Sequence, residues 1–90
     1  MFRECKSFNQ SLNNWDTSNV INMYGMFFGC ESFNQDISNW DVSNVIDMRY
    51  MFHECSSFNQ NISEWNVSKV KYKANMFYNC AIEEKYKPKF

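Results

Sequence analysis

A period of 25 residues is the sequence feature that most constrains this fold. Shifted by 25 positions, the chain aligns with itself without insertion, and residues 1–25 match residues 26–50 at 15 of 25 positions. Residues 26–50 match residues 51–75 at 13 positions. A constant period of this length is typical of solenoids, in which a repeat buries its apolar face only against a stacked neighbour. We therefore expect stacked coils of 25 residues each.

The period divides the 90 residues into about 3.5 coils, which form one predicted domain at residues 1–80. The coils are predicted at 1–25, 26–50, 51–75 and, in part, 76–80. No run approaches the ~18 apolar residues that a membrane span needs, and no secretory signal pattern follows Met1. The sequence thus predicts no membrane span and no signal peptide.

Lysines are concentrated at the C-terminal end. Residues 69–90 contain six lysines and two glutamates, whereas residues 1–68 carry eight acidic and three basic residues. We expect residues 81–90 to form a basic cap or tail that keeps the last coil soluble and prevents further stacking. Attachment to an anionic membrane or nucleic acid is the alternative, although the acidic body disfavours nucleic acid as a partner.

Each coil contains two different hydrophobic patterns. In residues 32–40, Phe33 and Ile37 alternate with polar residues, which favours a short strand. In residues 45–55 the apolar residues recur every three and four positions, which predicts a short helix with Asn44 as its N-cap. One short parallel strand and one short helix per coil predict an α/β, right-handed solenoid.

The repeat unit at residues 26–48 has the pattern Met-Phe-x-x-Cys-x-Ser-Phe-Asn-Gln-x-Ile-Ser-Asn-Trp-Asp-Val-Ser-Asn-Val-x-x-Met. This unit resembles the repeat of BspA-like bacterial surface proteins, which is abundant in mycoplasma lipoproteins and is classed as a divergent leucine-rich repeat. The resemblance runs from Met1 to about Cys80. It implies a leucine-rich-repeat-like solenoid, a location at the cell surface or in the secreted fraction, and a role in adhesion or protein interaction without catalysis.

Cysteine and tryptophan each recur once per coil. Cysteines 25 residues apart lie along a line rather than converging on one point, as metal ligands must. We therefore expect buried thiols rather than a metal site or disulfides. The tryptophans are expected to pack in the core, with the indole N–H bonded to the backbone, rather than to form a stacking platform for ligands. The cysteine column comprises Cys5, Cys30, Cys55 and Cys80, and the tryptophan column comprises Trp15, Trp40 and Trp65.

The residues that most enzymes need are scarce. The chain has one histidine, a net charge of −1 and no glycine-rich loop. Catalysis by His53 with Cys55 would require an exposed thiol beside the imidazole, whereas the repeat places this cysteine in the core. We expect a protein that is not an enzyme and that uses no cofactor and no metal.

A solenoid binds partners through positions that differ from coil to coil, because the repeated columns are occupied with stacking. The mixture of aromatic, arginine and histidine residues at these positions is typical of protein-binding surfaces. The candidate partner-binding residues on the predicted helical side are Arg3, Phe28, His53, Tyr78, Tyr24 and Arg49. Those on the predicted strand side are Ser11, Asp36 and Asn61.

Two functions remain open at this point. The first is a non-enzymatic module for protein interaction or adhesion, with a partner of unknown identity. The second is a structural or degenerate fragment of a larger surface array, with no partner of its own. Since the chain begins within a repeat, the coil at residues 1–25 is also predicted to self-associate.

Overall fold

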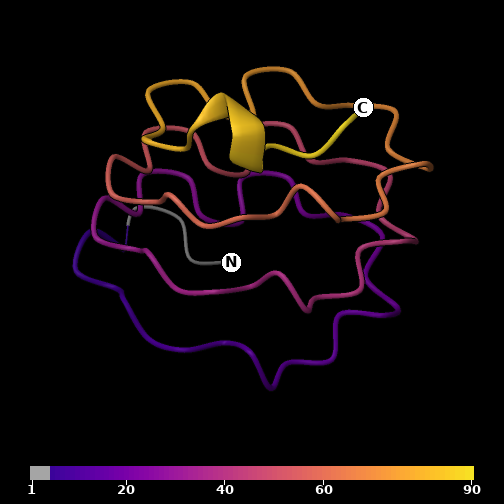
Figure 1. Cartoon of the computed structure of the whole chain (residues 1–90), viewed down its shortest axis with the longest axis horizontal. Coiled ribbons are helices and arrows are strands. Elements are labelled where there is room, and N and C mark those ends of the chain that lie inside the picture. The colour runs from indigo at the N-terminus through magenta and orange to yellow at the C-terminus, as the bar shows by residue number, and fades with distance from the viewer. Residues whose placement is uncertain (1–4) are drawn as a thin grey trace.

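Backbone hydrogen bonds join successive 25-residue units. The computed structural model describes residues 5–90, in which the chain passes repeatedly over itself from the first unit to the third (Figure 1). The N–H of Met23 donates to the carbonyl oxygen of Asp47 at 2.9 Å, and one period later the N–H of Met48 donates to that of Tyr72 at 2.8 Å. Every second residue from 23 to 29 and from 48 to 54 makes such a bond to the residue 24 positions later.

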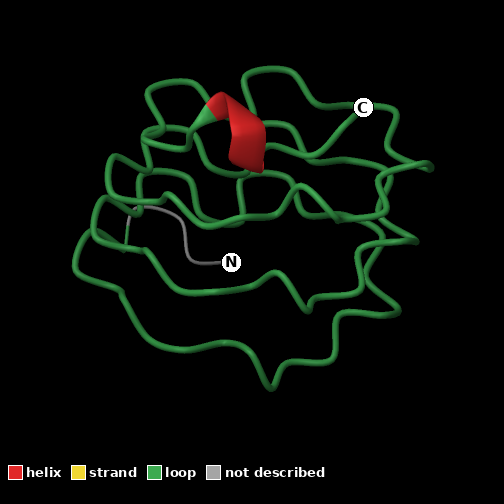
Figure 2. Cartoon of the chain, in the orientation of Figure 1, coloured by secondary structure: helices red, strands yellow, loops and turns green. Residues whose placement is uncertain are grey.

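The predicted α/β, leucine-rich-repeat-like solenoid is wrong. Residues 5–90 contain a single short 3-10 helix, η1, at Glu84–Tyr86 and no strand (Figure 2). Parallel pairing is limited to two isolated bridges, in which Asp47 pairs with Asn22 and with Tyr72. The result is a compact body of 30 × 25 × 21 Å built almost entirely from loops and turns.

The helix predicted at residues 45–55 is a series of tight turns. The N–H groups of Met51, His53 and Cys55 each donate to the carbonyl three residues earlier, at 3.1 to 3.3 Å. Tyr50 and Glu54 have φ angles of 58° and 60°, in the left-handed region that a right-handed helix excludes. Because consecutive three-residue turns also return side chains to one side, they produce the spacing that predicted a helix.

The strand predicted at residues 32–40 is also absent, although Phe33 and Ile37 are fully buried as expected. The backbone here is held by side-chain amides instead of by a strand ladder. The N–H of Asn34 donates to Oδ1 of Asn9 at 2.9 Å, and the N–H of Asn59 donates to Oδ1 of Asn34 at 2.9 Å. Each amide satisfies one backbone group of the next unit.

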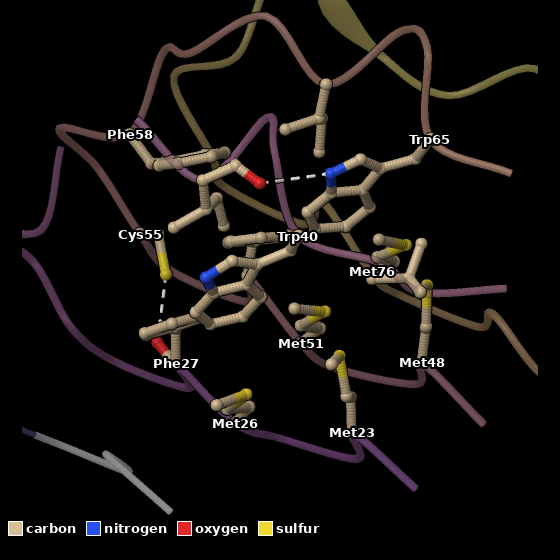
Figure 3. Close-up of a cluster of buried hydrophobic side chains, with 14 of the residues drawn as sticks. Met23, Met26, Phe27, Trp40, Met48, Met51, Cys55, Phe58, Trp65 and Met76 are labelled. Carbon is tan, nitrogen blue, oxygen red and sulfur yellow. Dashed lines mark hydrogen bonds between the residues drawn. The ribbon is translucent and has the colours of Figure 1, made fainter. Parts of the chain in front are cut away.

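Side chains one period apart stack in the core (Figure 3). The rings of Phe27, Phe52 and Phe77 lie with centroids 5.5 and 5.7 Å apart. Trp40 and Trp65 are buried, and each indole N–H donates to a backbone carbonyl, as the sequence predicted. The packed columns bury most of the apolar surface, and this burial is the main stabilising term of the fold.

Residues 81–90 lie against the third unit. Ile82 is buried, and the carbonyl of Tyr86 accepts a hydrogen bond from the N–H of Ile62 at 3.0 Å. Asn59 exchanges two hydrogen bonds with Glu83, one through its Oδ1 and one through its Nδ2. Within the described residues, the structure holds no helix of the length and hydrophobicity that crossing a membrane would require.

Candidate interaction surface

Aromatic side chains gather on the outer side of the segments that carry the backbone ladder. In these segments Met23 and Phe27 point into the core, whereas Tyr24 is 41% exposed and Phe28 is partly exposed. The same alternation recurs in the next two units. We call the resulting cluster the aromatic surface; it comprises Tyr24, Phe28, Arg49, Tyr50, His53, Tyr72 and Tyr78.

A stack of three rings runs along the aromatic surface. The His53 ring lies between Phe28 and Tyr78, with centroids 4.7 and 4.9 Å away and interplanar angles of 1° and 16°. Tyr50 tilts against it with a centroid separation of 5.5 Å. The Nδ1 atom of His53 is buried without a hydrogen-bond partner, and it lies 3.9 Å from Oε2 of Glu54. Stacking therefore holds the imidazole in place.

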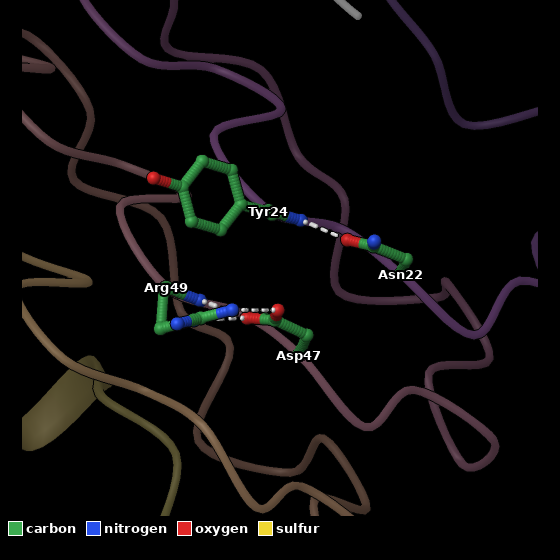
Figure 4. A network of polar contacts seen from close by, with 4 residues as sticks. All are labelled: Asn22, Tyr24, Asp47 and Arg49. Atoms are coloured by element: carbon green, nitrogen blue, oxygen red, sulfur yellow. Dashed lines mark hydrogen bonds and ion pairs between the residues drawn. The ribbon is translucent and has the colours of Figure 1, made fainter.

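A second column places a cation between two tyrosines. The guanidinium carbon of Arg49 lies 5.1 Å from the ring centroids of both Tyr24 and Tyr72. Asp47 fixes this guanidinium through bonds of 3.1 Å to Nε and 2.8 Å to Nη2 (Figure 4). The bonds from Arg49 lower the pKa of the Asp47 carboxyl and raise that of Arg49 itself. The cation is thereby held in one orientation over the rings.

The structure brings together five of the nine candidate residues of the sequence analysis, namely Tyr24, Phe28, Arg49, His53 and Tyr78. The three candidates from the predicted strand side make local bonds instead. Ser11 donates to Asn13 at 2.9 Å, while Oδ1 of Asp36 and of Asn61 accept from the backbone N–H two residues on. Arg3 lies outside the described residues.

Sequence reasoning missed Tyr50 and Tyr72, which complete the aromatic surface. Tyr50 occupies a column with Gly25 and Asn75, and Tyr72 occupies one with Asn22 and Asp47. Both positions differ from unit to unit, which is the criterion that selected the other candidates. Applied to every column, the same criterion includes them.

The cysteines lie on the other side of the backbone from the aromatic surface. Cys30 and Cys55 are fully buried, and the Cys55 thiol donates to the carbonyl oxygen of Phe27 at 2.9 Å. Burial raises the pKa of Cys30, Cys55 and Cys80, which keeps these thiols protonated at neutral pH. In residues 5–90, no group of three His, Cys, Asp or Glu side chains converges as metal ligands would.

A pocket adjoins the aromatic surface at the first unit. It has a volume of about 230 Å³ and is bordered by Trp15, Thr17, Met23, Tyr24 and Met26, among others. Its walls are mainly apolar because the methionines and Trp15 line it. A partner that contacts Tyr24 has this hollow directly beside it.

Comparison with known proteins gives one family. The model of a family described as "Mycoplasma protein of unknown function, DUF285" matches residues 1–88. Searches of curated proteins and of solved structures each found no match.

Proposed function

Because the chain belongs to the DUF285 family of mycoplasma proteins, we propose that it is a non-enzymatic module that binds another protein at the cell surface. The resemblance of its repeat to that of BspA-like surface proteins supports the surface location. The aromatic surface supports the binding role, and it is the observation that carries the proposal.

The composition of the aromatic surface is that of a protein-binding site. Tyrosine and arginine are enriched among the residues that dominate binding energy at protein interfaces. Tyr72 and Tyr78 are 50% and 55% exposed, so a partner has large apolar area to cover. Tyrosine loses little conformational entropy on binding because it has only two side-chain torsions.

The aromatic surface is also ordered before a partner arrives. His53 is stacked between two rings, and Arg49 is fixed by the carboxylate of Asp47. A surface that is already in its bound arrangement pays less ordering cost on association. The rings lie on backbone held by hydrogen bonds between units, which keeps their spacing constant.

A cross-linking experiment tests the proposal. A photoreactive phenylalanine analogue at Tyr78 would capture the partner on intact host cells, and the affinity of the purified partner would then be measured. We expect the double variant Tyr24→Ser/Tyr78→Ser to weaken binding at least tenfold, because two anchor side chains are lost. Ile21→Ser is the matched control, since Ile21 is an exposed apolar residue outside the aromatic surface.

Equal affinity of the double variant and the parent protein would refute the proposal. So would the absence of any cross-linked protein while the chain still unfolds cooperatively, since this result describes a structural fragment with no partner of its own. Ile21→Ser should retain the parent affinity; if it weakens binding as much as the double variant does, the aromatic surface is not the anchor.

A further inference from the structure

The backbone ladder ends in an unused row of donors on the third unit. In the second unit, the N–H groups of residues 48, 50, 52 and 54 donate to carbonyls of the third unit at 2.7 to 3.2 Å. The equivalent N–H groups of the third unit belong to Lys73, Asn75, Phe77 and Asn79. None of these four donates to a backbone carbonyl of residues 5–90. We call this row the open edge.

The C-terminal segment leaves the open edge uncovered by backbone. Residues 81–90 form their bonds to the third unit through Cys55, Asn59 and Ile62, on a different part of that unit. At the open edge they contribute only side chains. Lys87 Nζ lies 5.3 Å from the ring centroid of Phe77, and Lys73 Nζ lies 4.6 Å from that of Phe90.

The surroundings of the open edge are basic. In residues 5–90, the lysines of the C-terminal region that pair with a carboxylate are Lys85 and Lys87. Lys71, Lys73 and Lys89 form no ion pair with the described residues, and the first two are exposed in the segment that leads into the edge. Unneutralised lysines beside unused donors favour an acidic partner.

A pocket lies next to the open edge. It has a volume of about 360 Å³, and Trp65, Val67 and Val70 give it an apolar wall, while Lys73, Lys89 and Phe90 form its rim. An apolar side chain carried by a segment at the edge would enter this pocket, with the lysines at its mouth.

We propose that an extended, acidic segment of the partner protein adds to the open edge as a further strand. Its carbonyls accept from the four N–H groups, its carboxylates pair with Lys71, Lys73 and Lys89, and one apolar side chain fills the pocket. Addition of an extended segment to an exposed edge is a general mode of peptide recognition. The inference rests on the proposed function, because it names a second contact for the same partner.

Amide hydrogen exchange tests this contact directly. The probe is the acetylated, amidated peptide Glu-Val-Glu-Val-Glu-Val, and the control is its Lys-Val counterpart. At saturating acidic peptide, we expect exchange at Lys73, Asn75, Phe77 and Asn79 to slow at least tenfold, since each N–H gains an acceptor. The basic peptide should leave the four rates unchanged, and slowing by both peptides to the same degree would overturn the charge argument.

Lysine variants test the charge requirement. The variant Lys71→Gln/Lys73→Gln keeps the backbone donors and should weaken binding of the acidic peptide at least fivefold. Lys85→Gln is the matched control, because Lys85 is exposed but lies 3.8 Å from Glu83. It should bind the peptide as the parent protein does, and an equal loss in both variants would reduce the contact to general attraction.

Three results would overturn the proposal. The first is no slowing of the four amides at any peptide concentration. The second is binding of a ten-nucleotide DNA strand with the same lysine dependence and without protection of the four amides, which describes a site for polyanions. The third is protection that rises with protein concentration alone, which assigns the edge to a second copy of the chain.

This inference and the proposed function can fail separately. If the peptide protects the edge while the tyrosine variants leave partner affinity unchanged, the edge contact stands and the aromatic surface does not. If the tyrosine variants weaken binding while the peptide protects nothing, only the edge contact falls.

Discussion

The indole Nε1–H of Trp65 donates to the carbonyl oxygen of Ile37 at 3.2 Å, and the indole of Trp40 makes the equivalent bond to Leu12 at 3.0 Å. Each bond spans 28 residues and joins a tryptophan to the preceding unit. A buried carbonyl that would otherwise lack a partner is thereby satisfied. The tryptophan column thus contributes polar contacts between units as well as apolar area.

Replacing Trp40 by Phe should destabilise the protein by roughly 2 kcal/mol. The change leaves the buried carbonyl of Leu12 without this donor and removes part of the buried ring. Urea denaturation monitored by circular dichroism measures the loss. Trp15→Phe is the comparison, since Trp15 is 41% exposed, and its cost should be clearly smaller. Equal costs would show that the Leu12 bond contributes nothing.

Replacing Glu54 by Asn should stabilise the protein by about 0.5–1 kcal/mol, because asparagine tolerates the left-handed region better than glutamate. Glu54 has a φ of 60°, and the equivalent positions hold Gly29 and Asn79 at 72° and 54°. Chemical denaturation should show a higher midpoint. Glu54→Gln keeps the side-chain length and should leave the midpoint unchanged; a similar gain there would assign the effect to charge.

Acid should weaken the turns that Asp16 and Asp41 stabilise. Each carboxylate accepts hydrogen bonds from the side chain and backbone N–H of the serine two residues later, which lowers its pKa below the ordinary value. A lowered folded-state pKa adds stability above the unfolded pKa of about 3.9, and the stability is lost as pH falls through the folded-state value.

The measurement is the denaturation midpoint between pH 7 and pH 2. The variant Asp16→Asn/Asp41→Asn should lose less stability below pH 4 than the parent protein does, because an amide does not titrate. Asn66 already holds the equivalent position of the third unit and accepts from the N–H of Ser68 at 3.1 Å. Identical acid profiles of parent and variant would contradict the prediction.

Alkylation by iodoacetamide should distinguish the cysteines. Cys5 is exposed and should react in the native protein, whereas Cys30 and Cys55 should react only on unfolding. Their raised pKa values reduce the reactive thiolate further. Mass spectrometry of digested protein, with and without urea, gives the rate at each position. Equal native rates for Cys5 and Cys55 would show that the core opens freely.

The inward-facing side chains were predictable from the repeat, but the backbone was not. Phe33, Ile37 and Cys55 are buried as their columns indicated. The helix prediction failed because turns and helices share a three-residue recurrence of apolar side chains. Left-handed positions mark the turns, and in the second unit they hold Tyr50 and Glu54, residue types that carry no signal for this conformation.

Variation between units identified most of the aromatic surface, but not how it is assembled. The sequence placed Arg49 among the candidates, yet nothing in it indicated that the guanidinium would lie between Tyr24 and Tyr72. That placement depends on the bond to Asp47, which a spacing of two residues allows only in this turn. The predicted grouping of helical-side residues therefore held for residues that share the ladder segment.

The contacts between units restrict how a gene for such a protein can change in length. Ladder bonds, amide bonds and indole bonds join residues 24 to 28 positions apart, and all of them pass through the same stretch of chain. A codon gained or lost inside a unit would misalign the later partners together, whereas duplication of a whole unit would recreate every pairing. Growth of this sequence by complete repeats is the outcome that the bonding favours.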